Sequence, residues 1–243
     1  MIDLIAAFVF GAMFTIDVVV LVGLASIQPG IKIKAFAIAA GWVATVLTIA
    51  ALGGFAPGSL GPFPAPVLAF SILVIAGLAS WFFSPRFREA LLSLPLAALI
   101  GVNSLRIVGV FFLLLFAQDR LSAPFAPAAG WGDIITGVTA IPLAALAAYG
   151  KPVSNWVLAA WNAFGALDLI VAVTLAFLSA PGSPFQIFMD PRGTAVLTTV
   201  PWISAATLLV PLYLFTHFTI AARLRLDRKA SLERPVGMAL GQN

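Results

Sequence analysis

Long apolar stretches alternate along the chain with short segments that contain glycine, proline or charged residues. A helix needs about 20 consecutive apolar residues to cross the hydrocarbon core of a bilayer. Seven stretches reach or approach this length. The pattern therefore predicts an all-α bundle of seven transmembrane helices that forms one domain over residues 1–222. The predicted spans are 4–27, 35–55, 65–83, 96–118, 131–149, 155–180 and 195–222.

Three segments differ in composition or position from the apolar stretches within the chain. Residues 85–95 are amphipathic and predict a short interfacial helix, or a kinked start of the fourth span that ends at Pro95. Residues 223–243 are basic and then polar, and they predict a tail beyond the bundle. The first 27 residues carry Asp3 and no Lys or Arg, so we expect them to remain as the first helix rather than to be a cleaved signal.

The composition agrees with a membrane protein and excludes several kinds of site. Only 9% of the residues are charged, whereas a soluble domain carries about 25%, so most of the surface must face lipid. The chain has no Cys and a single His, so thiolate and multi-histidine metal sites are excluded, and we expect no metal and no cofactor. The net charge of +4 is explained by membrane orientation, and we expect no nucleic-acid partner.

Lys and Arg residues outside the spans predict the orientation of the bundle. Only Arg120 and Arg192 fall on the side opposite to the C-terminus. Because cytoplasmic loops of membrane proteins are enriched in Lys and Arg, the pattern predicts an N-out, C-in, multi-pass protein of the bacterial cytoplasmic (inner) membrane. Ten basic residues fall on the other, cytoplasmic side: Lys32, Lys34, Arg86, Arg88, Lys151, Arg223, Arg225, Arg228, Lys229 and Arg234.

Four ionisable residues lie within the predicted spans, namely Asp17, Arg106, Asp133 and Asp168. A bare charge at the bilayer centre costs about 2.5–3.5 kcal/mol, so these groups must be paired, protonated or hydrated. We expect Arg106 to face Asp17, Asp168 or both at mid-depth. Asp133 is only two residues inside the predicted fifth span, and we expect it at an outer entrance.

Neighbouring polar residues extend this predicted site. Asn103 precedes Arg106 by three residues on the same helical face and can add a hydrogen bond. Two acids around one base leave one carboxyl able to hold a proton. Tyr213 and His217 are four residues apart near the predicted inner end of the seventh span, where they would mark an inner exit. Alternatively, the Arg–Asp contacts only hold the helices together, and His217 is an ordinary residue at the membrane interface.

Two sequence patterns involve Asp133. The segment 133–139 (DIITGVT) is echoed by 168–174 (DLIVAVT), which indicates either an inverted repeat, as some transporters contain, or chance. Gly130-Trp131-Gly132-Asp133 resembles the G-x-G-D motif of intramembrane aspartyl proteases and is similar to that of prepilin peptidases. The resemblance implies that Asp17 or Asp168 completes a carboxylate pair. However, the chain lacks a Tyr-Asp pair and a Pro-Ala-Leu motif, and the predicted orientation puts Asp133 on the outer side.

The sequence supports three functional hypotheses. The first is a small proton-linked secondary carrier or permease with a substrate- or proton-binding site at Asp17, Asn103, Arg106 and Asp168, and no catalytic residue. The second is a non-catalytic accessory or ligand-sensing membrane subunit, and the third is the protease. The expected partners are the lipid bilayer, a small-molecule or proton substrate, and another membrane protein or a second copy of the chain. Seven spans also suit the rhodopsin plan, but no Lys lies in the last span to bind retinal.

Overall fold

The structure is a computed structural model that describes residues 1–61 and 63–233, and every regular element in these residues is helical. The predicted all-α fold is therefore confirmed for the described part of the chain. Elements η1 and η2 are 3-10 helices and η3 is a π-helix. In chain order the elements are α1 (Ile2–Leu24), α2 (Pro29–Ala51), α3 (Ala65–Phe83), α4 (Pro85–Leu92), α5 (Leu96–Gly101), η1 (Val102–Gly109), α6 (Val110–Ala117), α7 (Phe125–Ala148), α8 (Asn155–Leu178), η2 (Ala195–Thr198), η3 (Ala205–Leu209) and α9 (Val210–Glu233).

Within residues 1–61 and 63–233, seven helices are long and apolar enough to cross a membrane, as the sequence pattern predicted. Five of them are single α-helices, namely α1, α2, α3, α7 and α8. The fourth, Leu96–Ala117, consists of α5, η1 and α6, and the seventh, Ala205–Lys229, joins η3 to α9. The two composite helices both contain a non-α segment, and together they indicate a membrane protein whose interior is locally irregular.

Two helices, α2 and α7, begin six residues earlier than the apolar pattern suggested. Helix α2 starts at Pro29 rather than at residue 35, because proline is well suited to the first position of a helix, where no N–H is needed. Helix α7 starts at Phe125, directly after Pro124, rather than at residue 131. The alanine-rich turns that follow are good helix formers. The longer α7 moves Asp133 away from the helix end and into the middle of the helix.

The C-terminal part also differs from the expectation. Residues 195–202 contain only the short η2 and irregular turns, whereas the helix continues past residue 222 to Glu233. Arg, Leu and Lys favour helix, which explains why the first half of the predicted tail, 223–233, extends α9. The rest of that tail, 234–243 with Arg234, lies outside the described residues. The predicted interfacial helix 85–95 corresponds to α4.

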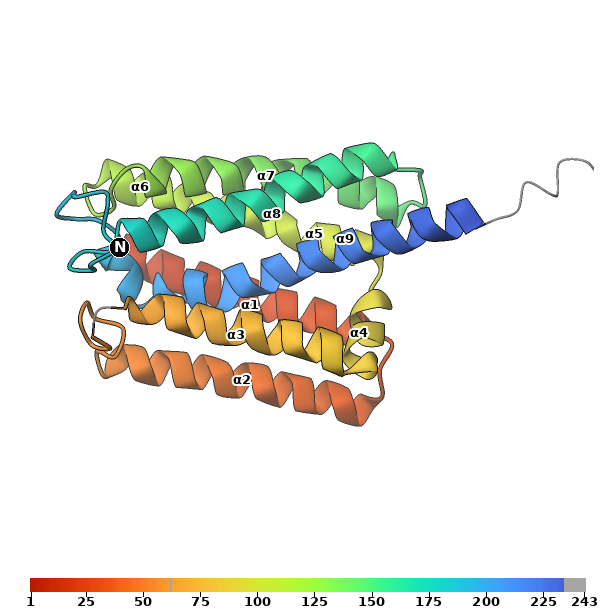
Figure 1. Ribbon diagram of the computed structural model, residues 1–243, viewed down its shortest axis with the longest axis horizontal. Coiled ribbons are helices and arrows are strands. Elements are labelled where there is room, and N and C mark those ends of the chain that lie inside the picture. Colours follow the sequence, from red (N-terminus) through yellow and green to blue (C-terminus); the bar gives the residue numbers. More distant parts are fainter. Residues whose placement is uncertain (62, 234–243) are drawn as a thin grey trace, which may run out of the picture.

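The helices lie roughly antiparallel in one bundle (Figure 1). Helix α7 packs against α8 and along the whole composite fourth span, and α9 packs against α8 and α3. Helix α2 lies at the edge of the bundle beside α1, and Val46 is its one buried residue. We call the end that carries α4 and the last turns of α9 the basic end, and the opposite end the N-terminal end.

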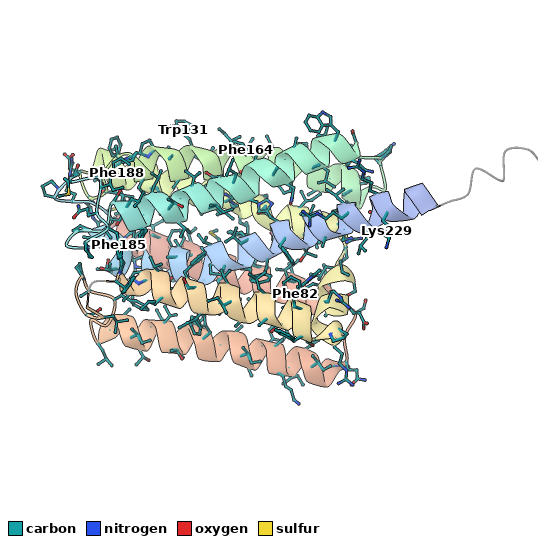
Figure 2. All side chains as sticks on the ribbon, in the orientation of Figure 1. Phe82, Trp131, Phe164, Phe185, Phe188 and Lys229 are labelled. Carbon is teal, nitrogen blue, oxygen red and sulfur yellow. The ribbon has the colours of Figure 1, made fainter. Side chains whose placement is uncertain are left out.

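Large apolar side chains such as Phe82, Trp131 and Phe164 lie exposed on the outer surface, as expected of lipid-facing positions (Figure 2).

The 3-10 segment η1 has a local cause in its sequence. Val102, Ile107 and Val108 are β-branched and favour α-helix weakly. The side chain of Asn103 donates to Leu99 O, which draws it into a local contact with the backbone. A 3-10 helix has three residues per turn, so every third side chain shares a face. Along the composite span this face is buried: Ile100, Asn103, Arg106, Gly109, Phe112 and Leu115.

The π-helix η3 precedes Pro211, which has no N–H to donate to the carbonyl of Thr207. In hydrocarbon an unsatisfied carbonyl costs several kcal/mol. Trp42 of α2 meets this need, because its indole Nε1 donates to Thr207 O at 2.9 Å. This hydrogen bond also ties the peripheral helix α2 to the centre of the bundle.

Ion pairs fasten the N-terminal end. Asp3 accepts hydrogen bonds from Arg120 Nη2 at 2.8 Å and from the indole Nε1 of the buried Trp202 at 2.7 Å, so α1 is tied to two distant segments. In the loop before η2, Arg192 pairs with Asp119 and Asp190. Hydrogen bonds from Arg192 lower the pKa of the Asp190 carboxyl below its ordinary value.

Candidate functional site

Arg106 is the centre of the buried polar cluster. It lies on η1 and is 1% exposed. Its Nε donates to Asp133 Oδ1 at 2.7 Å, and its Nη2 donates to Asp168 Oδ2. Its Nη1 donates to Gly165 O at 3.2 Å and lies 3.1 Å from His217 Nε2. One guanidinium therefore joins three helices, α7, α8 and α9, to the irregular fourth span.

Asp168 pairs with Arg106, as predicted from the sequence. Asp133 also pairs with Arg106, whereas the sequence predicted it at an outer entrance. Asp133 lies eight residues after Phe125, about 12 Å along the axis of α7. Asp168 lies ten residues before the end of α8, about 15 Å from that end. The side chains of Asp133 and Asp168 are 17% and 8% exposed. In the structure Asp133 is thus part of the mid-depth cluster, because α7 begins six residues earlier than predicted.

His217 also belongs to the centre of the bundle rather than to an inner exit. It is the middle residue of the span Ala205–Lys229 and is 1% exposed. Guanidinium nitrogens only donate, so Nε2 of His217 must accept from Arg106. The proton of the neutral ring then lies on Nδ1, which donates to Asn162 Oδ1 at 3.0 Å. Asn162 in turn donates through Nδ2 to His217 O at 3.1 Å, so α8 and α9 fix the ring from both sides.

Glycines let the helices approach closely enough for these contacts. A Cβ added to Gly132 would lie 1.6 Å from Asp168 Oδ1, and one added to Gly165 would lie 2.5 Å from His217 Cε1. Real Cβ atoms essentially never make such short contacts, so a larger residue at either position would force Asp168 or His217 out of the arrangement described above. Gly132 belongs to the G-x-G-D motif, and its role here is to admit the carboxylate of Asp168.

Asp17 and Tyr213 form a second polar group. Asp17 is 0% exposed and Tyr213 is 3% exposed, and the two side chains lie close enough to interact. Neither carboxylate oxygen of Asp17 nor Tyr213 Oη has a hydrogen-bond partner among the described residues. The expected pairing of Arg106 with Asp17 is absent from the described contacts of Arg106. Tyr213 connects the two groups, because the guanidinium carbon of Arg106 lies 6.0 Å from its ring centre.

Asn103 is buried at the same level but does not bind Arg106. Its Nδ2 donates to Leu99 O and to Thr216 Oγ1, both at 2.9 Å. The contact with Thr216 joins η1 to α9 one turn of helix away from Tyr213. Asn103 Oδ1 has no partner among the described residues. Asn103 therefore holds the 3-10 segment against α9 rather than extending the guanidinium network.

A small cavity of about 30 Å³ adjoins the cluster. Its polar lining comes from Arg106, Asp133 and Tyr213, and the rest is apolar, including Phe10 and Phe112. One water molecule needs about 10–15 Å³ of such volume, so the cavity has room for one or two. Arg106 uses four of its five N–H groups in the hydrogen bonds above. The polar corner of this cavity therefore offers a position where a guanidinium, a carboxylate and a phenol meet.

The charges of the cluster do not balance. The guanidinium carries +1, the two carboxylates that it bridges carry −2 when ionised, and His217 is neutral in the tautomer described above. One proton added to the pair of carboxylates would neutralise the cluster.

The part of the chain that the structure describes contains no group of three or more His, Cys, Asp or Glu that suits a metal ion. An arginine placed between two acids also differs from a protease pair, in which the carboxylates share a proton.

The sequence pattern did not predict a role for Asn162 or Gly165, or the central position of His217. Asn162 is an uncharged polar residue in an apolar span, and buried polar groups in a membrane need partners, which is the signal that would have pointed to it. Gly165 gives no such signal, because glycine is common in membrane helices. Only the distance to His217 identifies its role.

The fold and the site define a class: a helical protein with seven helices able to cross a membrane and a buried Arg–Asp–His cluster. The chain belongs to the family described as Domain of unknown function (DUF8737), whose model matches residues 63–225. This match runs from just before α3 into α9 and includes Arg106, Asp133, Asp168 and His217, while Asp17 lies outside it. The chain matches no curated protein and no solved structure.

Proposed function

We propose that this protein is a small proton-linked secondary carrier of the bacterial cytoplasmic membrane. The observation that carries the proposal is the bridging of Asp133 and Asp168 by Arg106. Ionisable residues within membrane helices are costly and are a common mark of proton relays and substrate sites. A cluster with two acids and one base has a place for one exchangeable proton.

The geometry supports a simple coupling between proton and substrate. When Asp168 is ionised, it engages Nη2 of Arg106. Protonation of Asp168 removes the negative charge that holds Nη2 and weakens this bond. Arg106 then has a donor available for the acceptor oxygen of a substrate, and carboxylates suit a guanidinium best. We therefore expect a substrate that bears a carboxylate.

The irregular helices supply a place for movement. Segment η1 carries Arg106, and a 3-10 stretch within a membrane helix often marks a hinge. Segment η3 contributes Ala205 and Leu209 to the cavity beside Arg106. Broken helices near mid-membrane are a recurring feature of carriers. We expect η1 to change its hydrogen bonding when Asp168 is protonated.

Asp17 would act as a second proton site. No basic residue in the described part of the chain offsets its charge, and an isolated carboxylate is costly in an apolar interior. We therefore expect Asp17 to hold a proton beside Tyr213. The distribution of Lys and Arg supports an N-out, C-in orientation with the basic end in the cytoplasm.

The proposal is tested in proteoliposomes with an imposed pH gradient. Uptake is measured for labelled lactate, alanine, glucose and choline, which represent an acid, an amino acid, a sugar and a cation. Wild type should accumulate at least one carboxylate-bearing solute only when the gradient is present. Asp168→Asn should abolish that accumulation, whereas Glu89→Gln, an exposed acid on α4, should not change it. Uptake that is unchanged in Asp168→Asn would remove the bridged acid from the mechanism.

The alternative is an accessory or ligand-sensing subunit in which the cluster only holds helices together. It is favoured by the extent to which Arg106 is already hydrogen-bonded within the bundle. This hypothesis predicts no accumulation of any of the four solutes and a stable protein partner after purification in mild detergent. A chain that purifies alone and transports a carboxylate would reject it.

A further inference from the structure

A second, larger cavity lies at the basic end of the bundle. Its volume is about 520 Å³, within the range of about 300–1,000 Å³ that is typical of small-molecule sites. It lies where the end of α7, the start of α8, the start of α5 and the side of α9 meet. The α7–α8 connection is at the same end of the bundle as α4 (Figure 1). The cavity is therefore separate from the Arg106 cluster and lies at the level where the spans end.

The lining of this cavity is amphipathic. Its apolar lining includes Leu158, Ile220 and Leu224. Its basic lining consists of Lys151, from the α7–α8 connection, and Arg223, from α9. Lys151 is exposed and has no ion-pair partner in the described part of the chain. An apolar wall beside two cations suits a ligand that combines an anionic group with hydrocarbon.

Arg223 is held in place by the protein itself. Its Nη1 donates to Leu94 O, in the turn before α5. The backbone contact fixes the side chain while leaving other N–H groups of the guanidinium for a ligand. Asp227, one turn further along α9, also lines the cavity and lowers its positive charge. Counting Lys151, Arg223 and Asp227, the net charge of the lining is +1.

The start of α8 adds to the attraction for an anion. Ser154 occupies the N-cap position but makes no side-chain hydrogen bond to the first turn. The first N–H groups of a helix then remain available, and the helix dipole favours negative charge there. Asn155, the first residue of α8, lines the cavity. Two cations and an uncapped helix start thus border the same volume.

We infer that this cavity binds a phosphate group, carried by an anionic phospholipid or by a free phosphate ester. The phosphate lies between Lys151, Arg223 and the start of α8, and the apolar wall holds the hydrocarbon part when the ligand is a lipid. Basic pockets between membrane helices are suited to anionic headgroups. The inference is independent of the transport proposal, because it uses none of the residues around Arg106.

Native mass spectrometry of the detergent-solubilised chain tests the site. The protein is incubated with phosphatidylglycerol, with phosphatidylcholine, and with phosphatidylglycerol plus excess inorganic phosphate. Wild type should retain one phosphatidylglycerol in preference to phosphatidylcholine. Lys151→Gln should weaken this binding about fivefold, the usual effect of one basic residue at a membrane surface. Lys34→Gln, an exposed lysine at the same end on α2, is the matched control and should leave binding unchanged.

The outcomes distinguish a phospholipid from a soluble phosphate ester, and they can also show that the cavity does not bind phosphate. Retention of phosphatidylglycerol that inorganic phosphate does not displace supports a lipid, and displacement by phosphate supports a soluble phosphate ester. Asp227→Asn should bind more tightly than wild type, because it removes the negative charge from the lining. Equal retention of both lipids, or an equal loss in Lys34→Gln and Lys151→Gln, would overturn the inference. Because Lys151 is exposed, its substitution leaves the fold intact.

Discussion

Arg106 Nε donates to Asp133 Oδ1 at 2.7 Å, across the contact between η1 and α7. Asp168 engages the same guanidinium from α8 through Nη2. The two acids begin the echoed segments 133–139 and 168–174, so the similar stretches supply equivalent ligands to one arginine. This arrangement explains how the chain keeps three ionisable groups within helices that are apolar enough to span a membrane.

Removal of Arg106 should be strongly destabilising. In Arg106→Gln two buried carboxylates lose their counter-charge, and breaking a buried ion pair by removing one partner costs about 3–5 kcal/mol. Thermal unfolding in detergent should show this loss. The triple variant Arg106→Gln, Asp133→Asn, Asp168→Asn should recover most of the stability, because no bare charge remains. A single variant as stable as wild type would show that the pairs are not formed.

Gly132→Ala should disrupt the contact between α7 and α8. The added methyl group would meet Asp168 Oδ1 at 1.6 Å, and overpacking typically costs about 1–3 kcal/mol. Gly41→Ala is the matched control, because no atom lies within 4 Å of its added Cβ. The control should be neutral or slightly stabilising, since alanine favours helix. Equal melting temperatures for the two variants would contradict the packing described for Gly132.

The tautomer of His217 can be read directly, because it is the one histidine of the chain. The hydrogen bonds to Arg106 and Asn162 require a proton on Nδ1 and none on Nε2. Nitrogen-15 chemical shifts of the labelled imidazole at neutral pH should show this tautomer. Asn162→Leu should release the ring and allow exchange between tautomers. A protonated Nε2 in the wild-type protein would be incompatible with the donor at Arg106.

Trp42 should contribute to stability through its indole N–H. Trp42→Phe keeps most of the apolar surface but removes the indole donor to Thr207 O next to Pro211, and an unsatisfied buried group costs about 1–3 kcal/mol. Trp131→Phe is the control, since Trp131 is 58% exposed. Thermal unfolding should show a lower melting temperature for the first variant alone. Similar values for both would mean that the carbonyl of Thr207 is satisfied in another way.

The apolar pattern predicted the class of fold well because hydrocarbon imposes a simple requirement on each span. Proline weakened the prediction of helix starts, since Pro29 and Pro124 begin helices as readily as they end them. The predicted start of α7 was six residues too late. Asp133 was therefore predicted at an entrance rather than beside Arg106. The non-α geometry of η1 and η3 is not visible in hydropathy, which depends on composition rather than on hydrogen bonding.

The sequence predicted that Arg106 pairs with buried acids, but it identified only one of the two acids correctly. Burial cost requires that Arg106 meet an acid, and Asp168 fulfils this requirement. Choosing between Asp17 and Asp133 as the second acid depends on how α1 and α7 pack around η1, which local sequence does not encode. His217 was misplaced for a similar reason, because the seventh span continues to Lys229 and so its centre lies further along the chain.

Solid-state NMR of the protein in lipid bilayers tests the bridging of two acids by one arginine most directly. With nitrogen-labelled arginine and carbon-labelled aspartate, the Arg106 guanidinium should show close contacts to two carboxyl carbons. One contact should disappear in Asp133→Asn, the other in Asp168→Asn, and both should persist in Asp17→Asn. A contact that is lost only in Asp17→Asn, or a guanidinium near no carboxyl carbon, would contradict the account.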